Sequence, residues 1–153
     1  MAHHLRKQQR DAIKATLIAA STNASSRVET ARVYPLAMNG TWPQITISGA
    51  DGEKIGTVGI GVPRLQERAY LVRISAFVKA VDGQTAEDDL DAVGLQIEKA
   101  LAANITLSGT AKFIRLLETH CDLTEQLEVP AGQLDMIYEV TATAFENAPD
   151  VLI

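Results

Sequence analysis

The stretch YLVRISAFVKA, residues 70–80, decides the fold class because apolar and polar side chains alternate along most of its length. Successive side chains of a β-strand point to opposite faces of a sheet, so this alternation predicts a strand. The face that should be buried consists of Tyr70, Val72, Ile74, Ala76 and Val78. The second face is amphipathic and consists of Leu71, Arg73, Ser75, Phe77 and Lys79. We therefore predict a sheet with one covered face, the other being either a partner surface or an ordinary half-covered exterior.

The chain after this strand predicts a helix and two more strands. Residues 85–104, TAEDDLDAVGLQIEKALAAN, carry apolar side chains at helical spacing, and Thr85 with Asp88 forms a capping-box arrangement. The core stripe of this helix is Leu90, Val93, Ile97 and Leu101. Residues 110–123 and 132–145 then indicate two strands joined by TEQLEVPAG. The last strand alternates most regularly, and its apolar face is Leu134, Met136, Tyr138, Val140 and Ala142.

The chain before residue 70 predicts a first helix and two short strands. Residues 5–20, LRKQQRDAIKATLIAA, place apolar side chains near one helical face and basic side chains on another. Short strands follow over 31–36 and 42–49. The Asn39-Gly40 turn signal between them indicates a hairpin-like pair.

A glycine-rich segment separates these strands from the strand at residue 70. Residues 49–68 hold five of the ten glycines, a density at which the backbone loses too much entropy for a regular core element. We therefore predict a long mobile loop or an extended flap over about 49–68.

The order of these elements predicts an α+β fold. Two helices would pack on one face of a mainly antiparallel, or mixed, sheet of about four to five strands with a long Gly-rich loop. The 153 residues, 46% of them hydrophobic, suit one domain over residues 1–153. Residues 147–153, NAPDVLI, are predicted to form a flexible tail. The alternative is an arm that adds to the sheet edge of a neighbouring copy.

Composition and charge disfavour several classes of protein. A net charge of -5 argues against a general nucleic-acid binder, which needs a basic surface. The single cysteine, the lack of a signal sequence after Met1 and the lack of a long apolar run favour a cytoplasmic protein that contacts no membrane. No metal or cofactor is predicted, because the histidines match no zinc spacing and GTVGIG lacks the glycine order of a phosphate-binding loop. The acidic run Glu87, Asp88, Asp89 and Asp91 is interpreted as a solvated helix cap.

Cys121 is the candidate for catalysis, since His120 precedes it directly. In a strand these neighbours point to opposite faces, so the imidazole is badly placed to take the thiol proton. A free cysteine is more often a small buried hydrophobic residue. We therefore predict that the protein is not an enzyme, and a small cysteine-dependent enzyme stays the less favoured alternative.

Five segments carry a resemblance to a known family: LRKQQRDAI, WPQITI, YLVRISAFVKA, DDLDAVGLQIEKAL and QLDMIYEVTATAF. In order and spacing they resemble the tail-terminator proteins of long-tailed phages, of the lambda minor tail protein U type, over nearly the whole chain. The resemblance implies a structural phage or prophage protein, not an enzyme. Such a protein forms a hexameric ring on the head-proximal end of the tail tube. The ring stops polymerisation of the tube and provides the surface for head-tail joining.

The resemblance also implies partners and a location. The partners would be further copies of the chain, the tail tube protein and the head-tail connector protein. DNA would pass through the ring without specific recognition, which the acidic balance suits because like charges repel. The protein would lie in the host cytoplasm during assembly and then in the virion tail. Two matters stay open: whether the free protein is a monomer, and whether the chain is instead a monomeric adaptor or scaffolding domain for one protein partner.

Two surfaces are candidates for these contacts. A ring needs two different patches on each copy, and the glycine-rich segment would supply one of them together with the amphipathic strand face. Its predicted contact residues are Val58, Ile60, Val62, Arg64, Leu65, Glu67, Arg68 and Arg73. The second candidate is the basic face of the first helix, which is either solvated or docked on an acidic partner. It consists of Arg6, Lys7, Arg10 and Lys14.

Overall fold

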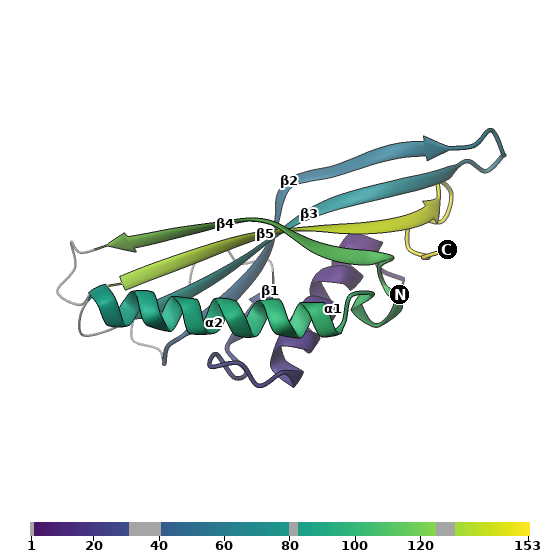
Figure 1. Ribbon diagram of the computed structural model, residues 1–153. Helices are drawn as coiled ribbons and strands as arrows, with labels where there is room; N and C mark the ends of the chain where they lie inside the picture. The colour runs from purple at the N-terminus through teal and green to yellow at the C-terminus, as the bar shows by residue number, and fades with distance from the viewer. Residues whose placement is uncertain (1, 31–40, 80–82, 125–130) are drawn as a thin grey trace.

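The strand that contains residues 70–79 lies at the centre of a five-stranded sheet. The computed structural model describes residues 2–30, 41–79, 83–124 and 131–153. Its elements in chain order are α1 (Leu5–Ala19), β1 (Val28–Thr30), β2 (Gln44–Val58), β3 (Leu65–Lys79), α2 (Gly83–Ala103), the short 3-10 helix η1 (Leu107–Gly109), β4 (Phe113–Thr124) and β5 (Ala131–Phe145). The strand order across the sheet is β1-β2-β3-β5-β4 (Figure 1).

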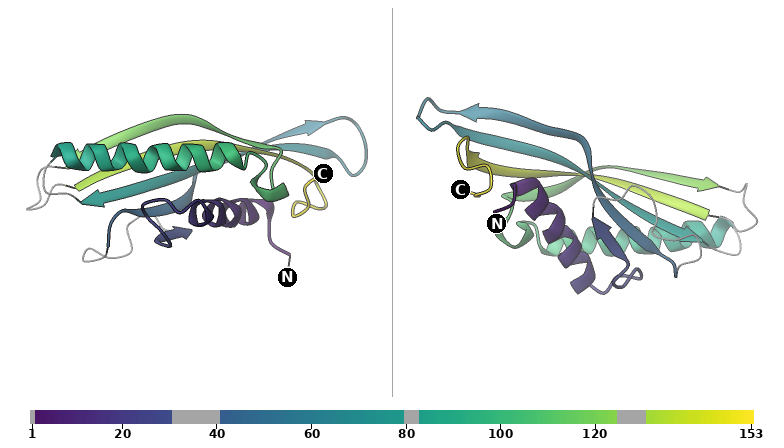
Figure 2. Two further views of the ribbon diagram at one scale, coloured as in Figure 1. Left: turned by 60° about the horizontal axis from the view of Figure 1, so that its bottom comes forward. Right: turned by 180° about the vertical axis from the view of Figure 1, so that it is seen from behind.

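Pairing in this sheet is mixed. The β2–β3, β3–β5 and β4–β5 pairs are antiparallel, and β1 pairs with β2 in parallel. Both long helices lie on the same side of the sheet (Figures 1 and 2). The predicted α+β class, with two helices and a mixed sheet, is therefore confirmed.

The core lies between the helices and the sheet, where the sequence periodicity places it. The buried face of β3 is the predicted one: Tyr70, Val72, Ile74, Ala76 and Val78. The buried stripe of α2 and the buried face of β5 also match prediction, and α1 adds Leu5, Ile13 and Leu17. Apolar burial of this kind is the main favourable term in folding, at roughly 25 cal/mol per Å².

The hairpin predicted before residue 49 falls partly outside the described residues. The strand predicted over 31–36 and the Asn39-Gly40 turn lie outside the described residues. Within these, β2 pairs with β1, whose residue Val28 lies opposite Ile45, and this pair is parallel. The Ile45 amide donates to the Arg27 carbonyl at 2.9 Å and extends the pairing by one bond.

The sequence predicted either a long mobile loop or an extended flap over about 49–68. Most of these residues are strand, which differs from a loop and agrees with an extended flap. β2 runs to Val58 and β3 begins at Leu65, so residues 59–64 alone form the turn. The glycines mark two local features instead, because Gly52 (φ +83°) lies at a bulge in β2 and Gly59 (φ +78°) opens the turn. Backbone pairing with β3, which β5 flanks on its other side, holds the glycine-rich part of β2 extended. Its mobility stays a prediction.

The C-terminal residues fold back on their own domain. The Ile153 amide donates to the Thr143 carbonyl at 2.9 Å, and the Leu5 amide donates to the Pro149 carbonyl at 3.3 Å. Leu152 packs on a small cluster that contains Leu5, Ala142 and Ala144. These contacts lie within one chain, and the flexible tail over 147–153 and the arm on a neighbouring copy both stay predictions.

Candidate functional site

An outer arm, residues 53–70, is the part of the β2–β3 pair that follows the bulge in β2; its base lies against α1 and its end extends beyond the helices (Figures 1 and 2). Its tip, residues 58–64, carries Ile60 and Val62 at relative exposures of 102% and 94%. Within the described part of the chain, nothing covers these two side chains. Val58 and Ile55 on the same arm are also exposed. The arm therefore presents a cluster of apolar side chains to its surroundings.

An ion-pair network holds the arm on the helix side. Arg68 Nη1 lies 3.2 Å from Glu53 Oε1, and Arg68 Nη2 donates to Gln66 Oε1 at 2.8 Å. Arg6 of α1 lies 3.6 Å from the same carboxylate. The side chains of Arg68 and Glu53 are only 9% and 8% exposed. Arg68, predicted to be a contact residue, is therefore covered by its own chain and supports the arm.

An exposed ion pair joins the turn of the arm to the end of β5. Arg64 Nε donates to Glu146 Oε2 at 2.9 Å, and the Arg64 amide donates to Glu146 Oε1 at 3.1 Å. These hydrogen bonds lower the pKa of the Glu146 carboxyl and raise that of the Arg64 guanidinium. Both groups are open to solvent, so the pair adds orientation rather than much stability.

The other predicted contact residues lie on two parts of the arm and sheet. Val58 and Glu67 are exposed, and Leu65 is half-buried at the first residue of β3. Arg73 is half-buried farther along β3, and its Nε has no hydrogen-bond partner among the described residues. Their role in an interface stays a prediction.

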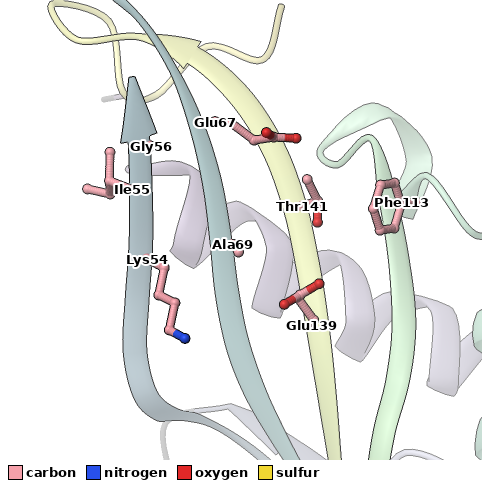
Figure 3. Close-up of a pocket in the computed structure, with 8 residues that line it drawn as sticks. All are labelled: Lys54, Ile55, Gly56, Glu67, Ala69, Phe113, Glu139 and Thr141. Carbon is pink, nitrogen blue, oxygen red and sulfur yellow. The ribbon is translucent and has the colours of Figure 1, made fainter. Parts of the chain in front are cut away.

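A groove runs along the sheet face that points away from the helices, which we call the open face. Three adjoining hollows of about 430, 290 and 190 Å³ form it. The first two share Lys54, Ala69 and Glu139, and the last two share Asp51, Leu71 and Leu117. Side chains of β2 and β4 form its walls over a floor of β3 and β5 (Figure 3). We call this feature the open-face groove.

The outer end of the open-face groove has a small-residue floor. Strand register sets Lys54 opposite Ala69, Ala69 opposite Thr141 and Thr141 opposite Phe113. These four residues form one row across four strands, and the small side chains of Ala69 and Thr141 lie between the larger ones (Figure 3). The resulting hollow is open to solvent along the sheet.

Acidic groups outnumber basic ones along the open-face groove. Its carboxylates are Asp51, Glu67, Glu118, Asp135 and Glu139, and its cations are Lys54 and Arg73. Glu139 is held by Arg115 at 2.8 Å, and Asp135 accepts hydrogen bonds from Ser75 and Gln133. Among the described residues, no group of His, Cys, Asp or Glu is arranged to hold a metal ion. The groove thus suits an apolar or basic segment better than an acidic one.

Among the residues that line the groove, the sequence prediction named Glu67 and Arg73 as contacts and placed Leu71 on the same strand face; Phe113, Leu117 and Glu139 are among those it missed. Phe113 and Leu117 are large, apolar and exposed. The signal for them was present, because Phe113 and Arg115 alternate with the buried Ile114 in the manner of a half-covered strand. The bulge between Leu116 and Glu118 leaves Leu117 at the groove wall.

The predicted basic face of α1 is occupied by partners from its own chain. Lys7 pairs with Asp11, and Lys14 lies 3.3 Å from Glu29. Arg6 contacts Glu53, and Arg10 donates to the Tyr70 hydroxyl at 2.6 Å. All four cations are thus engaged on the surface of α1, and docking of an acidic partner there stays a prediction.

The geometry around Cys121 does not activate its thiol. His120 Nε2 lies 3.0 Å from Glu118, and both residues line the open-face groove. Cys121 lies opposite the buried Leu134 and is exposed near α2. Partial burial, followed by the charges of Glu87, Asp91 and Asp122, raises the pKa of the Cys121 thiol. A nucleophilic cysteine requires the opposite shift.

Comparisons with known proteins give a distant likeness to a solved structure. No protein-family model matches the chain, and no curated protein matches it. A chain of a solved structure described as the virion of a native gene transfer agent particle is similar over 90% of this chain and 92% of that chain, at 15% identity and a TM-score of 0.35. Within the described residues, no helix is long and apolar enough to span a membrane.

Proposed function

We propose that the protein is a structural phage or prophage component that caps the head-proximal end of the tail tube as a ring. In this role it stops tube polymerisation and provides the surface for head-tail joining. The sequence resemblance, which extends over nearly the whole chain, suggests this function. The structural observation that carries it is the outer arm, whose tip exposes Ile60 and Val62 completely.

An uncovered apolar arm favours assembly over catalysis. Soluble monomers rarely present large contiguous apolar surfaces, and an ordered pair of strands that ends in aliphatic side chains is a contact element. The tip of the arm, residues 58–64, and the open-face groove are different surfaces of the same chain. A contact between different surfaces repeats head to tail and closes into a ring when the rotation allows it.

The mass of the protein in solution is the first test. We expect a reversible step from 16.5 kDa to about six times that mass as protein and magnesium concentrations rise, measured by light scattering after size exclusion. Purified tail tubes should then bind the protein at one end and stop growing in the presence of fresh tube protein. A protein that stays monomeric and fails to bind tubes would contradict the proposal.

A monomeric adaptor is the second candidate function, and the open-face groove is the observation that favours it. Such an adaptor would stay at 16.5 kDa and would bind one protein partner. A small cysteine-dependent enzyme is disfavoured by the raised pKa of Cys121. Slow reaction of Cys121 with a thiol reagent at neutral pH is expected, and rapid reaction would reopen that alternative.

A further inference from the structure

The tip of the outer arm carries two aliphatic side chains that are unusual in a solvent-exposed turn. Hairpin turns normally carry Asn, Asp, Ser, Gly or Pro, which satisfy the backbone locally and are well solvated. Here Ile60 and Val62 alternate with Gly59 and Gly61, and both aliphatic side chains are fully exposed. The tip is therefore a narrow turn from which two exposed aliphatic side chains project.

The open-face groove has the complementary shape. At its outer end the floor consists of Ala69 and Thr141, and Phe113 forms a wall. Leu71 and Leu117 continue the apolar lining into the next hollow. A narrow segment that carries aliphatic side chains fits such a groove better than a helix does, because the three hollows follow β3 from Glu67 to Arg73.

Charge identifies the segment that the groove accepts. Residues 55–66, IGTVGIGVPRLQ, contain no carboxylate, and their single charge is Arg64. The groove has five carboxylates against two cations. It would repel the acidic start of α2, around Glu87 to Asp91, and it would attract Arg64. The basic face of α1 matches the sign as well, but it lies on a helix, whose shape does not follow the hollows. Arg64 would exchange its solvent-exposed partner Glu146 for the groove carboxylates.

The tip cannot reach the groove of its own chain. The strands that carry the tip also form the wall and floor of the groove, and they are paired up to Val58 and Leu65. Folding the tip back would break this pairing and the β3–β5 pairing beside it. The groove that receives the tip must therefore belong to another copy.

We propose that the tip of the outer arm of one copy, residues 58–64, seats in the open-face groove of a second copy. Ile60 and Val62 lie against Ala69, Leu71 and Leu117, and Arg64 lies beside the groove carboxylates. Each copy gives its tip to one neighbour and takes the tip of another, so the contact is heterologous. This inference rests on the proposed function, since it supplies the subunit contact of the ring.

Two kinds of variant test this contact, and each kind removes one half of it and keeps the other. The tip variant carries Ile60→Asp with Val62→Asp and keeps its groove. The groove variant carries Ala69→Arg and keeps its tip, because the arginine side chain fills the groove beside Glu67 and Glu139. A second groove variant, Leu117→Asp, replaces an exposed residue at a bulge, where folding tolerates the change. Circular dichroism and thermal unfolding confirm that each variant is folded.

The matched control carries Leu95→Asp with Ile18→Asp. Both residues are large, apolar and exposed, and they lie on α2 and α1, on the other side of the sheet from the open-face groove. The control has the same change in charge and polarity as the tip variant. We expect it to assemble as the unmodified protein does.

Each variant alone should lose assembly, with at least about a 100-fold weaker association constant. An equimolar mixture of tip and groove variants should form a complex of two copies and nothing larger, because only one functional contact exists between them. Mass is measured by light scattering on the protein alone and by sedimentation with purified tail tubes.

The other outcomes separate the two proposals. If the tip and groove variants still form rings, or their mixture forms no two-copy complex, the tip-in-groove contact is wrong while the ring function stands. If a tip variant remains a ring but no longer binds tubes, the tip contacts the tube protein instead, which also overturns the inference. If the unmodified protein neither assembles nor binds tubes, the proposed function itself fails.

Discussion

The two ends of the β2–β3 pair are held by different interactions. At the inner end, apolar side chains such as Ile47 and Ile74 are fully buried beneath the helices. At the outer end, the strands are held by backbone pairing and by the network of Arg6, Glu53 and Arg68, while aliphatic side chains remain exposed.

This difference shows how one hairpin serves two purposes. Burial of apolar surface stabilises the inner end, which therefore needs no partner. The polar network fixes the outer end without using its aliphatic side chains, and these remain for contact with another molecule. Substitutions at the two ends should accordingly have different effects on stability and on assembly.

Glu53→Ala should have the largest effect on stability. It removes the carboxylate that Arg68 contacts at 3.2 Å and leaves a buried guanidinium without its charge partner. Removing one member of a buried ion pair costs about 3–5 kcal/mol. We expect a loss of this size in the free energy of unfolding, measured by chemical denaturation.

A double variant sharpens this test. Glu53→Leu with Arg68→Met replaces both charges by apolar groups of similar size, a change that is often neutral or stabilising. We expect it to recover most of the lost stability. If the double variant is as unstable as Glu53→Ala, packing rather than the unpaired charge explains the loss.

Ile74→Ala against Ile60→Ala compares a buried and an exposed isoleucine of the same β2–β3 pair. Ile74 is fully buried, and truncating a buried isoleucine costs about 2–5 kcal/mol through lost burial and cavity formation. Ile60 is fully exposed, so the free energy of unfolding should change by less than about 0.5 kcal/mol. Association should show the reverse order of effects. Equal losses of stability would mean that the tip is packed on its own chain.

A comparison of Gly132→Ala with Gly56→Ala tests how much room a methyl group has at the two ends of the sheet. A methyl group at Gly132 would approach Leu90 Cδ1 to 2.7 Å, whereas one at Gly56 meets nothing within 4 Å. Overpacking costs about 1–3 kcal/mol, while a glycine replaced without strain stabilises by about 0.4–1 kcal/mol. Thermal unfolding should therefore show opposite shifts, and a destabilised Gly56→Ala variant would contradict open space at that site.

Local periodicity was sufficient to predict the helices and the central strands. The buried face of β3 and the stripe of Leu90, Val93, Ile97 and Leu101 in α2 follow directly from spacings of 2 and 3.6 residues. Periodicity left the outer arm open between a mobile loop and an extended flap, because Gly52, Gly56 and Gly59 weaken the strand pattern. Pairing with a distant strand decided its structure instead.

The groove is harder to predict than the arm, because it depends on register between strands that are far apart in the chain. Lys54, Ala69, Thr141 and Phe113 come from four strands and meet in one row only after three pairings are set. The bulges after Gly49 and Leu116 shift that register further. No local pattern in the sequence predicts the register of these four strands. Ile60 and Val62, in contrast, were named as contact residues from the sequence alone.

Replacing His4 should have the smallest effect on stability among these substitutions. The expected effect is a change in how stability depends on pH. His4 caps α1, because its Nδ1 accepts a hydrogen bond from the Arg6 amide at 3.2 Å. Partial burial, followed by the positive charge of Arg6, lowers the pKa of His4. Arg68 acts in the same direction, while Glu53 and Asp150 oppose it. A protonated Nδ1 also cannot accept the capping hydrogen bond.

The sign of the pH dependence follows from this lowered pKa. The unfolded chain, with a histidine pKa near 6.5, binds the proton more readily than the folded chain does. The contribution of His4 to stability is therefore complete above about pH 6.5 and is lost as pH falls through the lowered folded pKa. His4→Asn keeps a side chain that caps helices well but does not titrate. The stability of the unmodified protein relative to His4→Asn should thus decrease from about pH 7 to about pH 5, because His3 and His120 are present in both and cancel. A difference that stays constant over this range would show that His4 does not contribute to the pH dependence of stability.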